Sequence, residues 1–88
     1  MYFVYMLKNA AGKLYIGITE NLENRLQYHN TKRGALFTKS EHKFSIVFSE
    51  QYPTLAEARQ REIQIKKWSR GKKEMLIERF QKGLPTKR

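Results

Sequence analysis

A hairpin of two short strands at the start of the chain constrains the fold more than any other feature of the sequence. Residues 2–8 and 13–18 are rich in aromatic and β-branched side chains, and only four turn-like residues separate them. A connection this short requires the two strands to pair in antiparallel fashion. Because residues 2–8 are apolar at both alternating sets of positions, we expect other elements to cover this strand on both faces.

The rest of the chain alternates between helical and extended patterns. Thr19 and Asn21 are suitable N-caps for a helix over residues 22–30. The pattern then predicts, in order, a polar and basic loop over residues 31–42, a strand over 44–48, a helix over 55–69, a break at Gly71, a helix over 72–81 and a frayed basic C-terminal tail over 83–88. The expected fold class is α+β: one domain over residues 1–82, a three-stranded antiparallel sheet flanked by three helices in the order β-β-α-β-α-α.

The composition excludes several classes of protein. With 88 residues the chain has room for one core. It contains no cysteine and no aspartate, which excludes zinc fingers, thiol nucleophiles, disulfide frameworks and aspartate-centred metal sites. The apolar start ends at Lys8 without the features of a signal peptide, and no apolar run reaches the roughly 18 residues that cross a bilayer. We therefore expect a cytoplasmic protein, a monomer, with no membrane partner.

Positive charge is concentrated in the second half of the chain. The net charge is +10; residues 1–58 hold seven basic and five acidic side chains, whereas residues 59–88 hold eleven and three. This balance is typical of proteins that bind a polyanion, although a cluster of lysines can also be an ordinary solvated helix face. We interpret the densest part of the basic segment as a nucleic-acid contact surface: Lys66, Lys67, Arg70, Lys72 and Lys73.

Glu62 lies among apolar positions of the predicted 55–69 helix. At 100° per residue its side chain falls between those of Ile65 and Ile63, close to Ala58, where an ionised carboxylate is costly unless it is paired or binds a metal. One interpretation is a helix salt bridge with Lys66, four residues later. The other is a metal ligand, because Mg²⁺ is commonly held by one or two carboxylates with water and substrate phosphate completing its shell.

Two further pairs of residues can serve phosphodiester chemistry. Arg25 and His29 are four residues apart on the first predicted helix and offer a fixed cation beside a group that titrates near neutral pH. Tyr5 and Tyr15 occupy the middle of the two hairpin strands, which brings them close together. Each pair also has an ordinary interpretation. The first pair can be polar residues on the surface of a helix, and the second pair can be tyrosines packed in the core. For His42 and Trp68 we expect only a loop histidine and a partly buried aromatic.

Taken in order, these residues resemble the GIY-YIG nuclease superfamily, most closely its small stand-alone bacterial members. The resemblance covers about residues 2–80. It rests on Val4-Tyr5-Met6, on Leu14-Tyr15-Ile16-Gly17, on the helix with Arg25 and His29, and on the segment from Ala58 through Glu62 to Lys66. The three-stranded antiparallel sheet with flanking helices that characterises this family matches the element order predicted above.

The resemblance implies hydrolysis of DNA phosphodiester bonds by a nuclease that uses one divalent cation, Mg²⁺ or Mn²⁺, held by Glu62. By the same resemblance Tyr5 and Tyr15 would line the scissile phosphate and one tyrosine would help to activate water. Arg25 would stabilise the charge of the transition state, and His29 would assist proton transfer or orient its neighbours. Which group is the general base stays open.

Three functions fit these observations. The first is an endonuclease whose specificity comes from DNA shape or from a protein partner, as in DNA repair or processing. The second is a nucleic-acid-binding module with a vestigial, non-catalytic site. The third is an accessory of a ribonucleoprotein, which the net charge of +10 would also suit. The complete set of two tyrosines, Arg25, His29 and Glu62 places the nuclease first.

Overall fold

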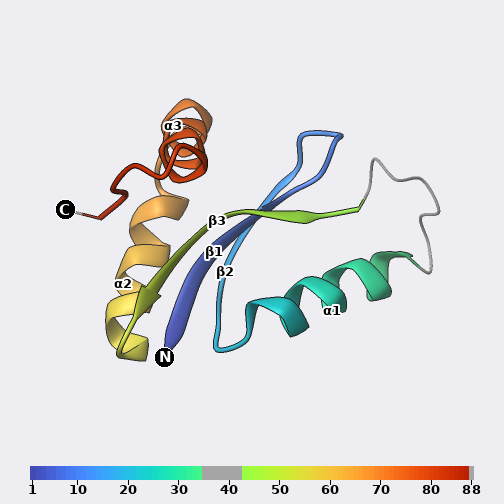
Figure 1. The fold of residues 1–88 in the computed structure, drawn as a ribbon, viewed down its shortest axis with the longest axis horizontal. Coiled ribbons are helices and arrows are strands. Elements are labelled where there is room, and N and C mark those ends of the chain that lie inside the picture. Colours follow the sequence, from blue (N-terminus) through green and yellow to red (C-terminus); the bar gives the residue numbers. More distant parts are fainter. Residues whose placement is uncertain (35–42, 88) are drawn as a thin grey trace.

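A computed structural model describes residues 1–34 and 43–87, with side chains for residues 1–31 and 43–87. The elements follow the order strand, strand, helix, strand, helix, helix: β1 (Tyr2–Lys8), β2 (Leu14–Thr19), α1 (Leu22–Gly34), β3 (Ser45–Tyr52), α2 (Leu55–Lys66) and α3 (Arg70–Gln81). The sheet lies between α1 on one side and α2 with α3 on the other (Figure 1). The predicted fold class and element order are confirmed. Within the described ranges, no helix is both long and apolar enough to span a membrane.

The strand from residues 2–8 is the centre of the sheet. The strand order is β2-β1-β3, and both neighbours run antiparallel to β1. The turn of the β1–β2 hairpin is closed by Asn9, whose side-chain Oδ1 accepts from the Lys13 backbone N–H at 2.9 Å. Gly12 has φ 88°, a left-handed conformation that glycine adopts without steric cost. The sequence thus fixes the register of the hairpin through its turn.

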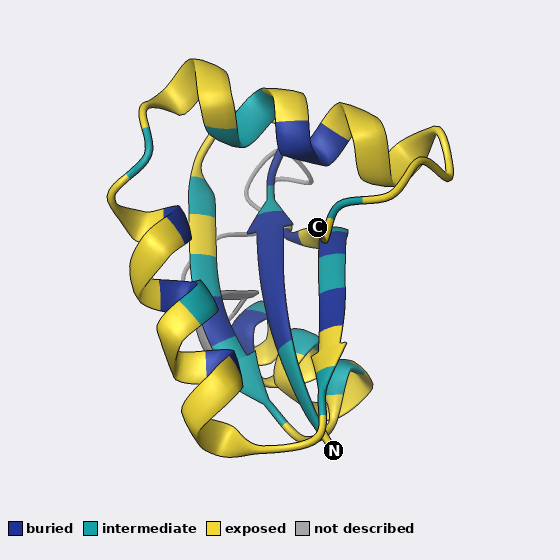
Figure 2. Cartoon of the chain, turned by 90° about the vertical axis from the view of Figure 1, so that its left-hand side faces the viewer, coloured by how far each residue is buried: buried dark blue, intermediate teal, exposed yellow. Residues whose placement is uncertain are grey.

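Two hydrophobic clusters cover opposite faces of β1. Val4 and Met6 point into the larger cluster, which α2 and α3 complete with Ala58, Ile65, Leu76 and Ile77. Tyr5 and Leu7 point the other way and pack with Phe44 and with Leu22 and Leu26 of α1. Figure 2 shows the resulting buried central strand with α2 and α3 packed beside it. The expectation that this strand is covered on both faces is confirmed.

Four predicted boundaries were wrong. The first helix continues to Gly34 instead of ending at residue 30; at residue 30 the Asn30 side chain pairs with the Phe44 backbone at 2.8 and 3.0 Å and secures the helix against the sheet. β3 extends to Tyr52, not residue 48, because it keeps pairing with β1. α2 ends at Lys66 and not at residue 69, with Lys67 as its C-cap. The break between the last helices therefore falls before α3 and not at Gly71, since Ser69 caps the Lys72 N–H. Residues 35–42, including His42, lie outside the described residues.

The C-terminal tail is bound where fraying was expected. The carbonyl of Thr86 accepts from the Arg61 guanidinium at 2.9 Å, and the carbonyl of Pro85 accepts from Arg79 at 2.9 Å. The Lys87 ammonium donates to the backbone carbonyl of Gln51 on β3. These bonds lay residues 85–87 along the outer edge of the sheet. Two of them come from side chains of α2 and α3, which local sequence patterns do not connect to the tail.

Candidate active site

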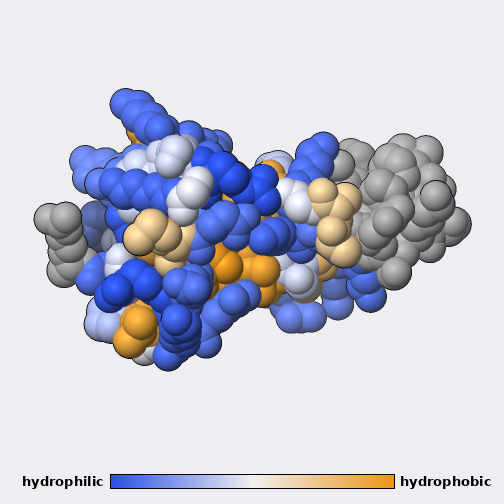
Figure 3. All heavy atoms as spheres, turned by 90° about the horizontal axis from the view of Figure 1, so that it is seen from above, coloured by the Kyte–Doolittle hydropathy of each residue, from blue (hydrophilic) through white to orange (hydrophobic). Residues whose placement is uncertain are grey.

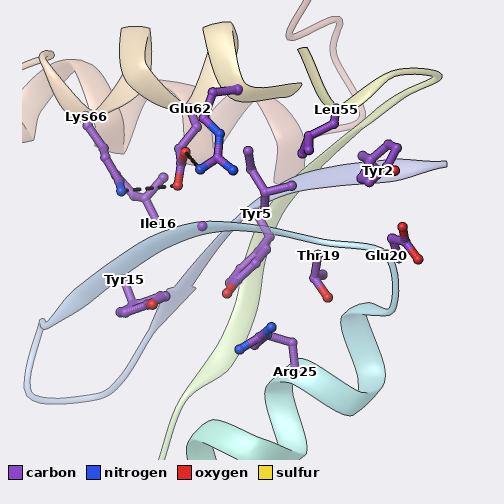
Figure 4. Close-up of a pocket in the computed structure, with 13 residues that line it drawn as sticks. Tyr2, Tyr5, Tyr15, Ile16, Thr19, Glu20, Arg25, Leu55, Glu62 and Lys66 are labelled. Atoms are coloured by element: carbon purple, nitrogen blue, oxygen red, sulfur yellow. Dashed lines mark hydrogen bonds and ion pairs between the residues drawn. The ribbon is translucent and has the colours of Figure 1, made fainter. Parts of the chain in front are cut away.

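A pocket of about 330 Å³ wraps around β2, the edge strand of the sheet. It gathers side chains from the three segments that hold the predicted catalytic residues: the β1–β2 hairpin, α1 and α2. Four of the five predicted catalytic residues line it: Tyr5, Tyr15, Arg25 and Glu62. Figure 4 shows that the two tyrosines and Arg25 lie on one side of the β2 ribbon and Glu62 on the other. The chain therefore brings together groups that are up to 57 residues apart in sequence.

The pairing of β1 with β2 explains why the tyrosines share a face. Tyr5 pairs with Gly17, and Tyr15 pairs with Leu7, so all four residues point toward α1. The rings of Tyr5 and Tyr15 are stacked with their centroids 6.3 Å apart. The predicted proximity of the two tyrosines is confirmed.

Gly17 is required because the Tyr5 ring lies across it. A Cβ atom built on Gly17 would be 2.7 Å from the Tyr5 hydroxyl oxygen and 3.0 Å from Cζ, closer than side chains approach one another. Gly17 has no positive φ, so its role is to leave space and not to provide an unusual backbone conformation. The bare backbone lets the Tyr5 hydroxyl reach the pocket from the buried side of the sheet.

Burial also sets the protonation of Tyr5. The residue is 2% exposed, and this burial, together with the neighbouring Tyr15, raises the pKa of its hydroxyl from 10.0 to about 12. Arg25 opposes the shift but does not cancel it. At neutral pH the Tyr5 hydroxyl is therefore protonated in the free protein and can donate a hydrogen bond into the pocket.

Glu62 is held in the apolar stripe of α2 that packs on the sheet. Thr54 caps this helix by accepting from the Glu57 N–H, and the buried residues of the helix are Ala58, Glu62 and Ile65. The prediction that Glu62 lies mid-stripe is confirmed: it is 6% exposed.

Two cations flank the Glu62 carboxylate in the free protein. Arg59 Nη1 lies 3.3 Å from Oε1, and Lys66 Nζ lies 3.1 Å from Oε2. The salt bridge predicted with Lys66 therefore exists. Both cations have more than half of their side-chain surface exposed, 57% for Arg59 and 54% for Lys66, so neither is locked in place. The carboxylate is buried, whereas its two partners are largely exposed.

The donors around Glu62 suit a Mg²⁺ ion that is completed by a substrate. The described part of the chain contains no cluster of three or more His, Cys, Asp or Glu side chains, so it offers no metal site made entirely of protein ligands. One buried carboxylate facing an open, polar pocket is instead the arrangement by which Mg²⁺ is bound jointly with phosphate and water. The residues present fit such an ion, and Glu62 is the carboxylate that could hold it.

His29 is the predicted site residue that does not line the pocket. It is 7% exposed on α1, and its ring meets the Tyr15 ring edge-on with the centroids 4.3 Å apart. Phe44 packs on it at 6.1 Å. His29 therefore contacts the pocket through Tyr15. Of the two roles considered from sequence, this position suits orientation of a neighbour.

The five predicted DNA-contacting residues do not form one patch. Lys66 lines the pocket beside Glu62. Lys72 lies over the Trp68 ring on another part of the surface, with 4.3 Å from Nζ to the ring centroid. Arg70 is tied to Glu74 at 2.8 Å and to the carbonyl of Gly12 in the hairpin turn. Lys67 is exposed and Lys73 half-buried. The face seen at the top of Figure 1, where α3 runs, is mostly hydrophilic (Figure 3).

Sequence reasoning missed a second buried glutamate. Glu50 of β3 is 4% exposed and accepts from Arg61 Nε at 2.9 Å and Nη2 at 3.1 Å, and from the Tyr52 hydroxyl at 2.8 Å. Burial alone would raise the pKa of Glu50, but the hydrogen bonds of Arg61 and the others bring it below its ordinary value of 4.5. The sequence pattern could have revealed this glutamate: Phe48, Glu50 and Tyr52 occupy alternate positions of β3 and therefore share the face that points to the core.

Comparisons with known proteins agree with this geometry. The sequence model described as the GIY-YIG catalytic domain matches residues 1–75. A UPF0213 protein from Bacillus pumilus is 39% identical over 77 residues, which cover 88% of this chain and 79% of that protein. A UPF0213 protein from Staphylococcus aureus is 40% identical over 76 residues, covering 86% and 93%.

A relative of known structure has a similar fold. The solution NMR structure of a UPF0213 protein from Bacillus halodurans superposes with a TM-score of 0.57 at 33% identity, covering 89% of this chain and 84% of that one. The matched fold, the hairpin with Tyr5, Tyr15 and Gly17, and the buried Glu62 lead to one conclusion. The chain belongs to the GIY-YIG family and carries its catalytic domain.

Proposed function

We propose that the protein is an endonuclease that hydrolyses DNA phosphodiester bonds with one divalent cation, Mg²⁺ or Mn²⁺. The observation that carries the proposal is the pocket around β2, where Tyr5, Tyr15 and Arg25 face Glu62 across one edge strand. A pocket with a hydroxyl donor, a guanidinium and a fixed carboxylate provides what a phosphodiester needs: recognition of its oxygens, stabilisation of developing charge and a metal ligand.

Each residue has a role that follows from its position. Arg25 lines the pocket on an exposed part of α1, and its planar guanidinium can bind two phosphate oxygens at once. Tyr5, with its pKa raised to about 12 by burial, donates a hydrogen bond to a phosphate oxygen or to the attacking water. Tyr15 is 39% exposed, lies beside Tyr5 in the pocket and contacts the substrate there. His29 holds the Tyr15 ring in position from behind.

Glu62 would hold the metal ion, which when bound lowers the pKa of coordinated water and neutralises charge on a phosphate oxygen. Arg59 and Lys66 compensate the Glu62 carboxylate in the free protein. Because both cations are more than half exposed, they can turn from the carboxylate to the phosphates of a bound strand without a change in the fold. We assign Lys66 and Arg59 to substrate binding in that state.

A second candidate function is a nucleic-acid-binding module whose site is not catalytic. The pairing of Glu62 with Lys66 and Arg59 favours it, because a carboxylate that is already paired needs no metal to explain its burial. Under this candidate the basic side chains still bind nucleic acid, and DNA or RNA is bound without being cut.

A metal titration of strand cleavage separates the two candidates. Supercoiled plasmid and labelled branched, single-stranded and duplex DNA of equal length are incubated at low salt with Mg²⁺, Mn²⁺ or EDTA. The proposal expects nicks that depend on the divalent ion, and a preferred substrate among the DNA forms identifies the shape that is recognised. Binding in every condition with no cleavage at any metal concentration, with or without an added protein partner, would support the second candidate.

A further inference from the structure

A larger groove lies on the opposite flank of α2 from the candidate active site. Its volume is about 810 Å³, and its lining includes Tyr52, Arg61, Gln64, Trp68, Lys72 and Lys87. On α2, the residues of the candidate active site recur at 59, 62 and 66, whereas those of the groove recur at 57, 61, 64 and 68, on the helix and just past its end. Side chains with these two spacings project from different sides of a helix. The groove is therefore a separate site.

The floor of the groove is rigid and electrically balanced. Arg61 is held by Glu50 through two hydrogen bonds, by the Gln64 side chain at 2.7 Å and by the Thr86 carbonyl at 2.9 Å. This network fixes the guanidinium 5.2 Å from the centroid of the Trp68 ring. The positive charge of Arg61 is neutralised by the carboxylate of Glu50, so other groups must supply any attraction for an anion.

Two lysines at the groove supply that attraction. Lys72 Nζ lies 4.3 Å from the Trp68 centroid, and Lys87 Nζ lies 4.0 Å from the Tyr52 centroid. Neither ammonium forms an ion pair with a carboxylate of the described residues. Glu57 also lines the groove; its carboxylate accepts from the Thr54 hydroxyl at 3.1 Å and keeps its negative charge, so the two lysine charges face one carboxylate charge. The groove therefore combines two aromatic rings with two cations that lack a carboxylate partner.

We propose that this groove binds an unpaired segment of nucleic acid, with one base stacked on Trp68 and the adjacent phosphates on Lys72 and Lys87. Aromatic rings beside lysines are the arrangement by which single strands are bound irrespective of sequence. The exchange is favourable, because a base stacked on an aromatic ring contributes more to binding than an exposed ammonium on the same ring does. Lys72 can therefore give up the indole face and move to a phosphate.

The groove and the candidate active site lie on different sides of α2 and adjoin near the C-terminal end of that helix. Lys66 lines the active-site pocket and Trp68 lines the groove, and two residues span at most about 7 Å of backbone. The exposed Lys67 lies between them at the end of α2. Binding in the groove does not require cleavage, so it can be tested with the metal removed.

The fluorescence of Trp68 reports directly on the proposed contact, because it is the single tryptophan of the chain. The full-length protein is titrated with a twelve-residue oligothymidylate at low salt in EDTA. We expect saturable quenching of the Trp68 emission. Trp68→Leu should weaken binding by about tenfold, the lower half of the range for one stacked base, and Trp68→Phe should retain most of the affinity. Lys72→Gln should weaken binding severalfold, whereas the matched Lys82→Gln, at the C-cap of the same helix, should not.

Three outcomes would overturn the proposal. The first is binding with unchanged Trp68 emission. The second is that Lys72→Gln binds as tightly as the wild type and that, in addition, a folded variant with a small side chain at position 68 binds as tightly as Trp68→Phe. The third is equal quenching by a blunt duplex of the same length, which would mean that phosphates alone are bound. Because Trp68 packs against the core, circular dichroism is measured on each variant, and Lys72→Gln decides the matter if Trp68→Leu does not fold. Loss of cleavage activity would not alter any of these readings.

Discussion

The ring of Tyr5 lies across Gly17, so that a Cβ atom built on Gly17 would be only 2.7 Å from the Tyr5 hydroxyl oxygen. Tyr5 is 2% exposed and packed against Leu7 and Phe44, so it cannot move aside freely. We expect Gly17→Ala to lower the free energy of unfolding by about 1–3 kcal/mol, the usual cost of overpacking, and to displace the hydroxyl from the pocket. Chemical denaturation measures the first effect and DNA nicking the second.

The control for this substitution is Gly71→Ala. No atom lies within 4 Å of a Cβ on Gly71, which is in the first turn of α3, so alanine there should raise stability by up to about 1 kcal/mol. Adding Tyr5→Phe to Gly17→Ala should recover part of the lost stability, because it removes the closest atom. Two glycine variants of equal stability would contradict this explanation of Gly17.

Replacing Tyr5 by Phe should separate activity from folding. The ring and its packing are retained, so the melting temperature should change by no more than a few degrees. If the hydroxyl donates to the substrate or to water, cleavage should fall by about 10²- to 10⁴-fold. Single-turnover nicking and calorimetry on the same preparation test both statements. Unchanged cleavage would mean that Tyr5 has only a structural role.

Two buried hydroxyls make the protein sensitive to alkali. Burial, with Tyr15 nearby, raises the pKa of Tyr5 to about 12, and burial with the hydrogen bond to Glu50 raises that of Tyr52 to about 12. Between pH 10 and 12 the unfolded chain loses these protons while the folded protein keeps them, so stability should fall as the pH rises through this range. Denaturation at pH 9 and pH 11.5 tests it. Tyr5→Phe should reduce the difference, and an equal difference in the variant would contradict the assignment.

Glu50 should contribute far more to stability than its surface counterparts. Its carboxylate is 1% exposed and pairs with Arg61, so Glu50→Gln leaves a buried guanidinium without its counter-ion and should cost about 3 kcal/mol or more. For a domain of this size that lowers the melting temperature by more than about 10 °C. The lowered pKa of Glu50 also means that its contribution is present above about pH 4.5 and is lost on acidification. Glu78→Gln, on the exposed face of α3, should change stability little.

Local patterns predicted the elements of the fold because they are set by neighbours in the sequence. The hairpin follows from its four-residue turn, and the covered central strand follows from apolar residues at both alternating positions. Boundaries decided by distant contacts were missed. The first helix is secured at Asn30 by Phe44, fourteen residues later, and the tail is held by Arg61 from α2. Neither partner is visible in a local window.

The candidate site was predictable as a set of residues but not as an arrangement. Glu62 stands out because a charge in an apolar stripe is unusual, and the two tyrosines stand out because the hairpin aligns them. The sequence did not reveal that His29 lies behind Tyr15, outside the pocket, or that Arg59 joins Lys66 in pairing with Glu62. Nor did it reveal that Lys72 belongs to a groove with Trp68, because that contact depends on how α3 folds back after Ser69.

Glu62→Gln tests the central claim most directly, because glutamine keeps the shape of the side chain and removes its charge. The paired cations are more than half exposed and remain solvated, so stability should change by no more than about 1 kcal/mol. DNA binding in EDTA should be retained or slightly stronger, since a negative charge has left a basic surface. The measurement is metal-dependent nicking of plasmid DNA by this variant beside Glu78→Gln. We predict that nicking falls below detection for Glu62→Gln and is unchanged for Glu78→Gln; a folded Glu62→Gln protein that nicks DNA like the wild type would contradict the proposal that Glu62 is the metal ligand of a nuclease.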